Sequence, residues 1–250
     1  MLSKNEIKKL VKYKQDKYRK QDEIYIVEGV KLCKELLDSD IDILSIYAIE
    51  TWIEENAKLL EVKALMPLVR EITQEELEKI SHLTTPNQVY CLCRRTPCQL
   101  TTTPKGLTLV LDGIKDPGNL GTIIRIADWY AIENIICSQD CVDVYNPKTV
   151  RAAMGAVFRQ KVLVMERREM REYLSCHGMS LYGAALSDAS KDIRTVSLER
   201  AAVAIGSEGK GLSAEFLELC DGEIIIPMNE QCESLNAGVA AAIVMWELCR

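Results

Sequence analysis

The chain lacks the patterns that mark several common classes of protein. No run of about 18 apolar residues occurs among its 250 residues, so we expect no membrane span. The first twenty residues are charged and contain no apolar h-region, which predicts no signal peptide. Without such a signal, the cysteines are expected to be free thiols in a reducing cytoplasm.

Patterns that bind metals are also missing. The sequence has two histidines, His82 and His177, and none of its ten cysteines forms a Cys-x-x-Cys pair. Structural zinc sites need closely spaced Cys and His ligands. We therefore expect no metal.

The composition is that of an ordinary soluble globular protein, with 48% hydrophobic and 27% charged residues. The length suits one large domain or two small ones. The net charge is −6, but residues 1–20 hold eight Lys/Arg and two acidic residues, so this segment carries +6 and the remainder −12. Such a basic arm suits a phosphate-rich partner, and it equally suits a solvated helix face.

The first third of the chain predicts a small α/β domain, residues 1–95. Its expected strands are 24–27, 43–49 and 89–93, and its expected helices are 30–37, 51–60 and 75–80. The stretch 94–106 is rich in Thr and Pro and has no apolar period. It predicts a linker over 96–106, so the second domain would span 107–250.

The second domain alternates predicted strands with predicted helices. The strands are 107–111, 134–137, 162–165, 180–186, 201–205 and 223–226. The helices are 120–130, 147–159, 168–176, 213–219 and 234–249. This alternation predicts a parallel α/β sheet, in which ligands bind at the carboxyl ends of the strands.

The first sequence block that suggests chemistry is L-D-G-I-K-D-P-G-N-L-G-T-I-I-R, residues 111–125. A buried strand leads into a turn at residues 116–118, and Asn119 is a plausible N-cap for the helix that follows. Arg125 lies six residues further on, where its guanidinium can reach a phosphate or a ribose oxygen. The same pattern also fits a capped helix with a surface arginine.

The second block, A-A-V-A-I-G-S-E-G-K-G-L at 201–212, is a strand followed by a glycine-rich loop. The Walker A spacing fails, because Ala204 stands where its first glycine belongs and Gly211 follows the lysine. The spacing is not G-x-G-x-x-G either, so a nucleotide-binding or redox α/β protein is disfavoured. Glu208 remains as a polar group in a cleft.

The third block, residues 224–243, is a strand that ends at Pro227, a polar loop and a final helix. Ser234 is predicted to cap that helix. A packed face is predicted from Leu235, Val239, Ala242 and Trp246. Small residues at 237, 238, 240 and 241 allow close approach of a backbone or a flat ligand.

Together the three blocks resemble the motifs of the SpoU/TrmH family of SPOUT methyltransferases. The matching elements are N-L-G-T-I-I-R at 119–125, G-S-E-G-K-G-L at 206–212 and I-P-M with S-L-N at 226–236. The segment 146–158 is also family-like. Y-I-V-E-G-V-K at 25–31 and I-S-H-L-T-T-P at 80–86 more weakly resemble the ribosomal-protein-like substrate-binding domain of many members.

The resemblance implies a sheet tied in a trefoil knot that binds S-adenosyl-L-methionine. Residues at the positions of Gly206, Ile226 and Leu235 would hold the cofactor, helped by the strand end at Ala185 and Leu186. It also implies a homodimer, with Arg125 acting across or beside the interface.

The implied reaction is transfer of a methyl group to a ribose 2′-hydroxyl of RNA. Arg125, Asn119, Glu208, Ser234 and Asn236 are the expected catalytic residues. A guanidinium stays protonated, which favours Arg125 as a cation that lowers the pKa of the hydroxyl, while Glu208 takes the proton directly or through a neighbour. Family proposals that make the arginine the base remain the alternative.

The extra N-terminal domain favours rRNA, and 23S rRNA above other targets, over tRNA. A tRNA ribose methyltransferase, a base methyltransferase and a non-catalytic RNA-binding protein of the same fold remain open. The sequence departs from the family pattern at Glu230, where a glycine is common, and at Ala237-Gly238, where Val-Ser is common. Glu230 would add a negative charge beside the cofactor loop.

Overall fold

A computed structural model describes residues 1–96, 106–198, 200–229 and 234–249. The described chain forms two compact units. The first contains residues 1–96 and 145–158, and the second contains residues 106–144 and 159–249. Most of the predicted linker 96–106 falls outside the described residues.

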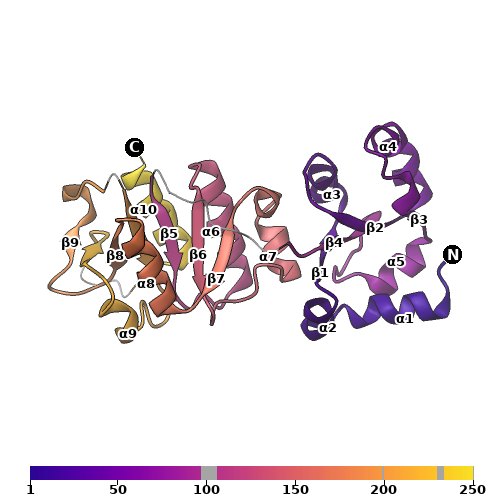
Figure 1. The fold of residues 1–250 in the computed structure, drawn as a ribbon. Helices are drawn as coiled ribbons and strands as arrows, with labels where there is room; N and C mark the ends of the chain where they lie inside the picture. The colour runs from indigo at the N-terminus through magenta and orange to yellow at the C-terminus, as the bar shows by residue number, and fades with distance from the viewer. Residues whose placement is uncertain (97–105, 199, 230–233, 250) are drawn as a thin grey trace. The chain divides into compact units, whose positions relative to one another are not determined.

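The first unit is built on a four-stranded sheet (Figure 1). Its order is β1 (Ile24–Glu28), β4 (Val89–Arg94), β2 (Ile43–Ala48) and β3 (Val69–Glu71). Strand β4 is antiparallel to β1 and β2, and β3 is parallel to β2. The three predicted strands are present, and β3 is an additional edge strand.

Helices cover both faces of this sheet. Figure 1 shows α3 (Val30–Leu37) and α4 (Glu50–Val62) on one side, and α1 (Lys4–Lys12), α2 (Asp16–Gln21) and α5 (Gln74–Ile80) on the other. Helices α1 and α5 each begin with a capping box, formed by Ser3 with Glu6 and by Thr73 with Glu76. The 3₁₀ turn η1 (Met66–Leu68) precedes β3.

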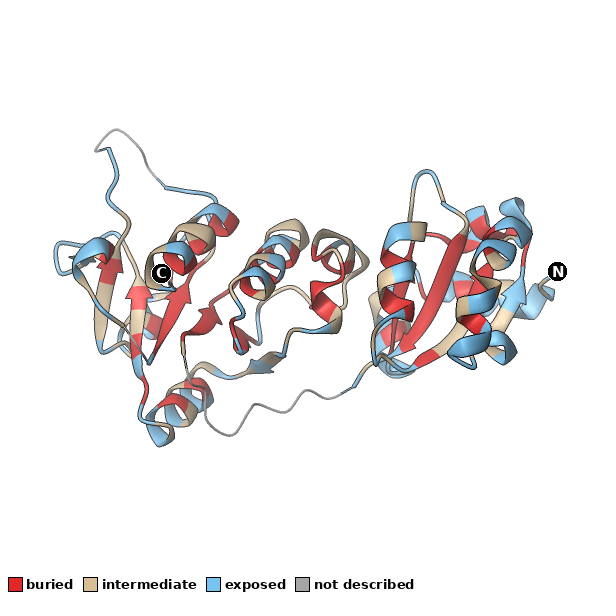
Figure 2. Ribbon diagram, turned by 90° about the horizontal axis from the view of Figure 1, so that it is seen from above, coloured by how far each residue is buried: buried red, intermediate tan, exposed pale blue. Residues whose placement is uncertain are grey.

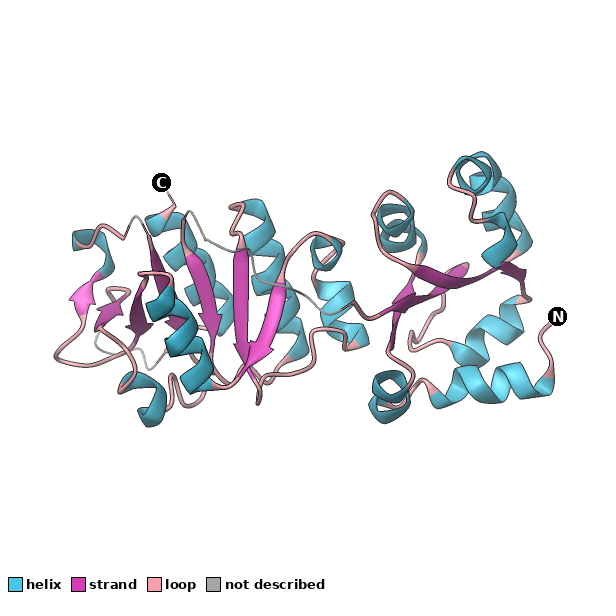
Figure 3. Ribbon diagram, in the orientation of Figure 1, coloured by secondary structure: helices cyan, strands magenta, loops and turns pink. Residues whose placement is uncertain are grey.

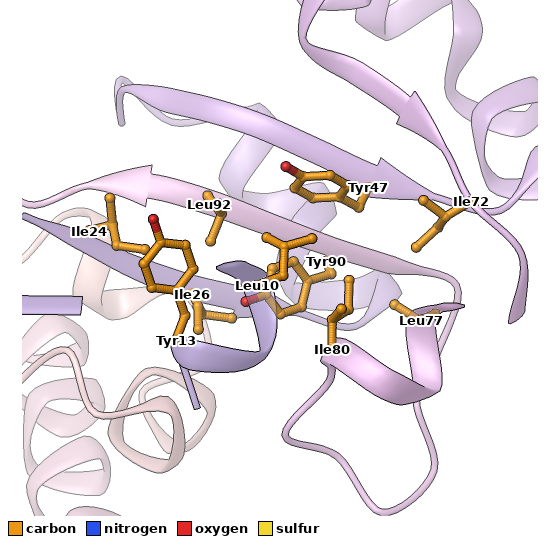
Figure 4. Packing of buried hydrophobic residues seen from close by; sticks show 10 residues of the cluster. All are labelled: Leu10, Tyr13, Ile24, Ile26, Tyr47, Ile72, Leu77, Ile80, Tyr90 and Leu92. Atoms are coloured by element: carbon orange, nitrogen blue, oxygen red, sulfur yellow. The ribbon is translucent and has the colours of Figure 1, made fainter. Parts of the chain in front are cut away.

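The core between the sheet and α1 and α5 is rich in aliphatic and tyrosine side chains (Figure 4). Leu10 of α1, Tyr13 directly after α1, and Leu77 and Ile80 of α5 pack on side chains of β1, β2 and β4 such as Tyr90. Burial of this apolar area is the main force that holds α1 against the sheet.

The segment 145–158 packs with the first unit, a grouping that no sequence pattern indicated. The Tyr145 ring stacks on Tyr25, with ring centroids 4.5 Å apart, and the Arg95 guanidinium lies 5.1 Å from the Tyr145 centroid. The predicted helix 147–159 is two short pieces, α7 (Pro147–Ala152) and η2 (Ala156–Phe158). The break contains Gly155, whose φ of 84° falls in the left-handed region that favours glycine.

The second unit is the predicted parallel α/β sheet, with seven strands. Their order is β7 (Val162–Met165), β6 (Asn134–Ser138), β5 (Thr108–Leu111), β10 (Ala201–Ile205), β8 (Ser180–Ala184), β11 (Gly222–Ile225) and β9 (Lys191–Asp192). Every neighbouring pair is parallel. The central strands β5, β6 and β10 are buried along their whole length, as sheets covered on both faces require (Figure 2).

Helices cover both faces of this sheet (Figure 3). Helices α8 (Arg167–Cys176) and α9 (Ala214–Leu217) pack on one face through Met170, Leu174 and Phe216. Helices α6 (Pro117–Trp129) and α10 (Ala237–Leu248) lie side by side on the other face, and the turn η3 (Ile193–Thr195) follows β9. No helix within the described ranges is long and apolar enough to cross a membrane.

Two predicted helix caps are wrong. Helix α6 begins at Pro117 and is capped by Asp116, whose Oδ1 accepts from the backbone N–H of Asn119 at 2.8 Å. Helix α10 is capped by Asn236 rather than Ser234. In both loops two residues of capping type stand within three positions of each other, so the sequence alone does not decide which one caps.

The predicted packed face of the last helix is also wrong. Leu235, Val239 and Trp246 are exposed, and Ala242 is half-buried. The buried side of α10 consists of Ala237, Gly238, Ala241, Val244 and Met245. Apart from Glu247, this helix consists of apolar residues and one glycine, so periodicity cannot identify its packed face, and the small residues allow close approach to α6.

Candidate functional site

Three of the predicted catalytic side chains meet in the second unit. They are Asn119 in the first turn of α6, Glu208 in the loop after β10 and Asn236 at the start of α10. The Nδ2 group of Asn236 donates to Glu208 Oε1 at 2.6 Å and lies 3.1 Å from Asn119 Oδ1. The Nδ2 group of Asn119 also donates to Glu208 Oε1. These residues form one hydrogen-bonded cluster, which we call the Asn-Glu-Asn cluster.

The local backbone explains why these side chains converge. Asn236 Oδ1 accepts from the N–H groups of Gly238 and Val239, at 2.9 and 3.3 Å, which directs its Nδ2 toward Glu208. The Glu208 loop is closed by paired backbone hydrogen bonds between Ser207 and Gly211, at 3.0 and 2.8 Å. Within the described parts of the chain, the second carboxylate oxygen of Glu208 makes no hydrogen bond. It is therefore available to accept a hydrogen bond from a ligand hydroxyl group, or the proton of that hydroxyl.

Arg125 and Ser234 do not join this cluster. Arg125 follows Asn119 by six residues on α6, which places it about 9 Å along the axis and about 120° around it. It is exposed on the same face as Thr122 and Trp129, and it has no partner among the residues that the structure covers. Ser234 is likewise exposed, at the edge of a segment that the structure does not describe.

A cleft of about 470 Å³ adjoins the Asn-Glu-Asn cluster. Its lining comes from the loops that follow β5, β6 and β10 and from the start of α8, where the strands end. Asn119, Glu208 and Ala237 line one part, and Lys115, Asp140 and Arg167 line another. This is the position at which parallel α/β sheets bind their ligands.

The floor of the cleft contains a charge network that the sequence analysis missed. The Arg167 guanidinium donates to Asp112 Oδ1 at 2.7 and 2.8 Å and to Asp140 Oδ1 at 3.0 Å. Asp112 is only 2% exposed, and its other oxygen accepts from the N–H of Ser213 at 3.0 Å. A signal was present, because Asp112 directly follows a buried strand.

The network shifts the pKa values of Arg167 and Asp140 so that both charged forms are favoured. Partial burial alone lowers the pKa of Arg167, but the charges and hydrogen bonds of Asp112 and Asp140 raise this pKa overall. Burial alone raises the pKa of Asp140, but Ser138 and Arg167 lower it overall. Both groups are therefore held in their charged forms, and the Arg167 side chain is fixed before any ligand arrives.

Cys141 stabilises the loop 111–114, which lines the cleft. Its Sγ accepts from the N–H of Ile114 at 3.3 Å and lies 3.4 Å from the carbonyl oxygen of Leu111. A hydrogen bond from Cys137 lowers the pKa of Cys141 to about 7, against partial burial, which raises it. The thiol is thus a polar support for the loop 111–114.

The predicted cofactor residues lie at three neighbouring strand ends. Gly206 follows β10, Leu186 comes two residues after β8, and Ile226 follows β11, and these strands are adjacent in the sheet. A Cβ atom on Gly206 would lie 2.0 Å from the carbonyl carbon of Gly211, so only glycine fits this loop. Leu186 and Leu235 are 58% and 45% exposed. None of the four lines the cleft described above.

The surroundings of the predicted cofactor residues suit a flat apolar ligand better than a metal ion. Leu186, Met228 and Leu235 are exposed apolar side chains on segments that follow β8, follow β11 and precede α10. Across the described ranges, no group of three or more His, Cys, Asp or Glu side chains is arranged to hold a metal ion. Glu230, the departure from the family pattern, lies outside the described residues.

Fold and site together define a two-unit α/β protein whose second unit has a cleft at the carboxyl edge of a parallel sheet. The chain belongs to the SpoU rRNA methylase family, whose model matches residues 106–246. Residues 4–91 match the MRM3-like substrate binding domain. The resemblance read from the three sequence blocks is therefore confirmed.

Individual relatives agree with this assignment. The chain is 33% identical over 180 residues to the 23S rRNA (guanosine(2553)-2′-O)-methyltransferase RlmP of Bacillus subtilis, a match that covers 71% of each chain. It is 30% identical to an uncharacterized tRNA/rRNA methyltransferase of Synechocystis, over 98% of this chain and 90% of the relative. The AdoMet-bound rRNA methyltransferase of Sinorhizobium meliloti superposes with a TM-score of 0.87 at 25% identity, over 99% and 95% of the two chains.

Proposed function

We propose that the protein transfers a methyl group from S-adenosyl-L-methionine to a ribose 2′-hydroxyl of structured RNA, with 23S rRNA as the substrate. The observation that carries the proposal is the Asn-Glu-Asn cluster beside the cleft, with one Glu208 oxygen free among the described residues. The named activities of the relatives in Bacillus subtilis and Sinorhizobium meliloti support it. Residues 107–250 would be the catalytic domain and residues 1–95 the RNA-binding domain.

The cofactor would be held at the ends of β8, β10 and β11. Backbone atoms of Gly206, Ile226 and Leu235 would bind its polar groups, and Leu186 would cover its apolar surface. S-adenosyl-L-methionine supplies a methyl carbon that is already activated by the neighbouring sulfonium. The protein therefore has to orient the ribose and increase the nucleophilicity of its hydroxyl oxygen.

Different residues carry out these two tasks. Glu208 accepts the hydroxyl proton on its available oxygen, while Asn119 and Asn236 hold the carboxylate through its other oxygen. Arg125 acts as a fixed positive charge that stabilises the developing oxyanion, since a guanidinium does not lose its proton at neutral pH. Ser234 completes the polar wall next to Asn236.

A homodimer would bring Arg125 to the site. In a single chain Arg125 is exposed beside Trp129, which is 84% exposed. On α10, next to α6, Val239 and Trp246 are 48% and 61% exposed. Large apolar side chains on two adjacent helices are typical of a protein interface, and a twofold dimer would cover them.

The test is tritiated methyl transfer from the cofactor to ribosomal RNA and, in parallel, to tRNA. Nuclease digestion followed by mass spectrometry then locates the methyl group. We expect a 2′-O-methylnucleoside in 23S rRNA. A methylated base or labelled tRNA would replace this proposal with the corresponding alternative. Failure to bind the cofactor in calorimetry would indicate a non-catalytic RNA-binding protein.

A further inference from the structure

The first unit carries a concentrated positive surface that the proposed chemistry does not use. Seven side chains on α1, α2 and the turn between them form what we call the lysine surface. These are Lys4, Lys8, Lys9, Lys12, Lys14, Lys17 and Lys20, and all of them are exposed. The chain as a whole has a net charge of −6, so this surface is a local exception.

The acidic residues nearby do not neutralise it. Glu6 is used in the capping box, where hydrogen bonds with Ser3 lower the pKa of its carboxyl group. Asp16 binds Arg19 at 3.1 Å and Lys20 at 2.8 Å, and Asp22 accepts from the Tyr13 hydroxyl at 2.6 Å. Within the described chain, every lysine of the surface except Lys20 lacks a carboxylate at ion-pair distance.

The backbone beneath these lysines is fixed. Arg19 is 3% exposed, and its guanidinium donates to the Tyr13 carbonyl oxygen at 2.6 Å, which holds the turn between α1 and α2. Leu10 and Tyr13 anchor α1 in the core of the unit (Figure 4). Lys4, Lys8 and Lys12 repeat every four residues, so they form a row along one helix face with a spacing of about 6 Å.

One helix on the other face of the sheet has the opposite charge. Helix α4, which covers the other face of the sheet, carries Glu50, Glu54, Glu55 and Glu61 against Lys58 (Figure 1). A polyanion would therefore be attracted to α1 and α2 and repelled from α4. This polarity gives the unit a defined orientation on nucleic acid.

We propose that the lysine surface binds the sugar–phosphate backbone of the RNA substrate. This inference rests on the proposed function and specifies which face of the N-terminal unit holds the RNA. Ammonium groups on a rigid helix contact phosphates with little sequence preference, and release of counterions supplies the affinity. Selection of the target nucleotide would then depend on the cleft.

The experiment compares two full-length variants of equal net charge. One carries Lys4→Gln, Lys8→Gln and Lys12→Gln, and the matched control carries Lys58→Gln, Lys63→Gln and Lys79→Gln, three exposed lysines of the same unit. Affinity for a fluorescein-labelled 23S rRNA fragment and for a short duplex RNA is measured by anisotropy over a series of salt concentrations. Calorimetry with S-adenosyl-L-methionine and thermal melting confirm that each variant is folded.

We expect the first variant to bind both RNAs about tenfold more weakly. The slope of log affinity against log salt concentration should become less steep by roughly 2 to 3, about 0.7–0.9 for each lost phosphate contact. The control should bind like the wild-type protein. Equal losses in the two variants, or an unchanged slope in the first, would overturn the proposal. If the wild-type protein binds RNA with a steep salt dependence but transfers no methyl group, the proposed function is refuted and the proposed RNA contact of the lysine surface is not.

Discussion

Asn236 donates its side-chain amide to Glu208 at 2.6 Å while its side-chain oxygen caps α10. The residue that starts the last helix therefore also holds the carboxylate of the candidate site. The cap is local to residues 236–239, whereas the bond to Glu208 also needs the loop after β10 in place. The cap fixes the amide orientation that the contact with Glu208 uses.

Replacement of Arg125 by alanine should abolish most methyl transfer without unfolding the protein. Loss of one fixed positive charge at a developing oxyanion costs about 10²–10³ in rate. Arg125 is exposed and unpartnered within the described structure, so thermal stability and cofactor affinity should not change. Arg168→Ala, at another exposed arginine, is the control. A near-wild-type rate for Arg125→Ala would rule out both roles considered for this residue.

The pH dependence of the rate identifies the group that takes the proton. If Glu208 is the base, the rate of methyl transfer falls at acidic pH as the carboxylate becomes protonated. Glu208→Gln should be slower and should lose this acidic limb. Measurements at saturating cofactor and RNA separate the chemical step from binding. An acidic limb that persists in Glu208→Gln would exclude the carboxylate as the base.

Gly206→Ala should damage the cofactor site, whereas Gly209→Ala should not. The new Cβ atom at 206 would collide with the backbone of Gly211 and Leu212, and overpacking of this kind costs about 1–3 kcal/mol. At Gly209 no atom lies within 4 Å of the added Cβ. Denaturant unfolding and calorimetry with S-adenosyl-L-methionine give the two readouts. Equal behaviour of the two variants would contradict the tight loop.

Cys141 should react with iodoacetamide at lower pH than Cys249. Hydrogen bonding from Cys137 lowers the pKa of Cys141 to about 7, while burial raises that of Cys249. The thiolate is the reactive form, so labelling of Cys141 should increase with pH and reach half its maximum near pH 7. Peptide mass spectrometry assigns each site, and Cys141→Ser removes the signal. A midpoint near that of an ordinary thiol would argue against the hydrogen-bonded arrangement.

Trp246→Glu should convert the proposed dimer into monomers and remove activity. The side chain is 61% exposed on α10, and a buried, unpaired carboxylate at an interface is strongly unfavourable. Light scattering after gel filtration measures the mass. Val62→Glu, at an apolar position of α4 that is 75% exposed, is the control and should leave both mass and activity unchanged. A Trp246→Glu protein that keeps the wild-type mass would place any interface elsewhere.

The sequence was most informative where the chain alternates buried strands with amphipathic helices. Apolar runs predicted β5, β6 and β10 closely, because strands buried on both faces are mostly apolar. The edge strands β3 and β9 were missed, since Val-Arg-Glu and Lys-Asp show no such pattern. Edge strands need fewer apolar residues, so composition hardly marks them.

The sequence predicted part of the candidate site. Asn119, Glu208 and Asn236 were all expected and do meet. The pairing of Asp112 with Arg167, 55 residues later, depends on how α8 returns to the sheet, which no local pattern encodes. The buried face of α10 was missed for a related reason, because an all-apolar helix gives no preferred side until its neighbour is known.

The separation of Arg125 from Asn119 around α6 predicts complementation between inactive subunits. In the proposed dimer, each reaction centre combines the cluster of one subunit with the arginine of the other. Two inactive proteins, Arg125→Ala and Asn236→Ala, should then complement each other when mixed and reassembled. One centre of every mixed dimer would be intact, which restores about a quarter of wild-type activity if subunits pair at random.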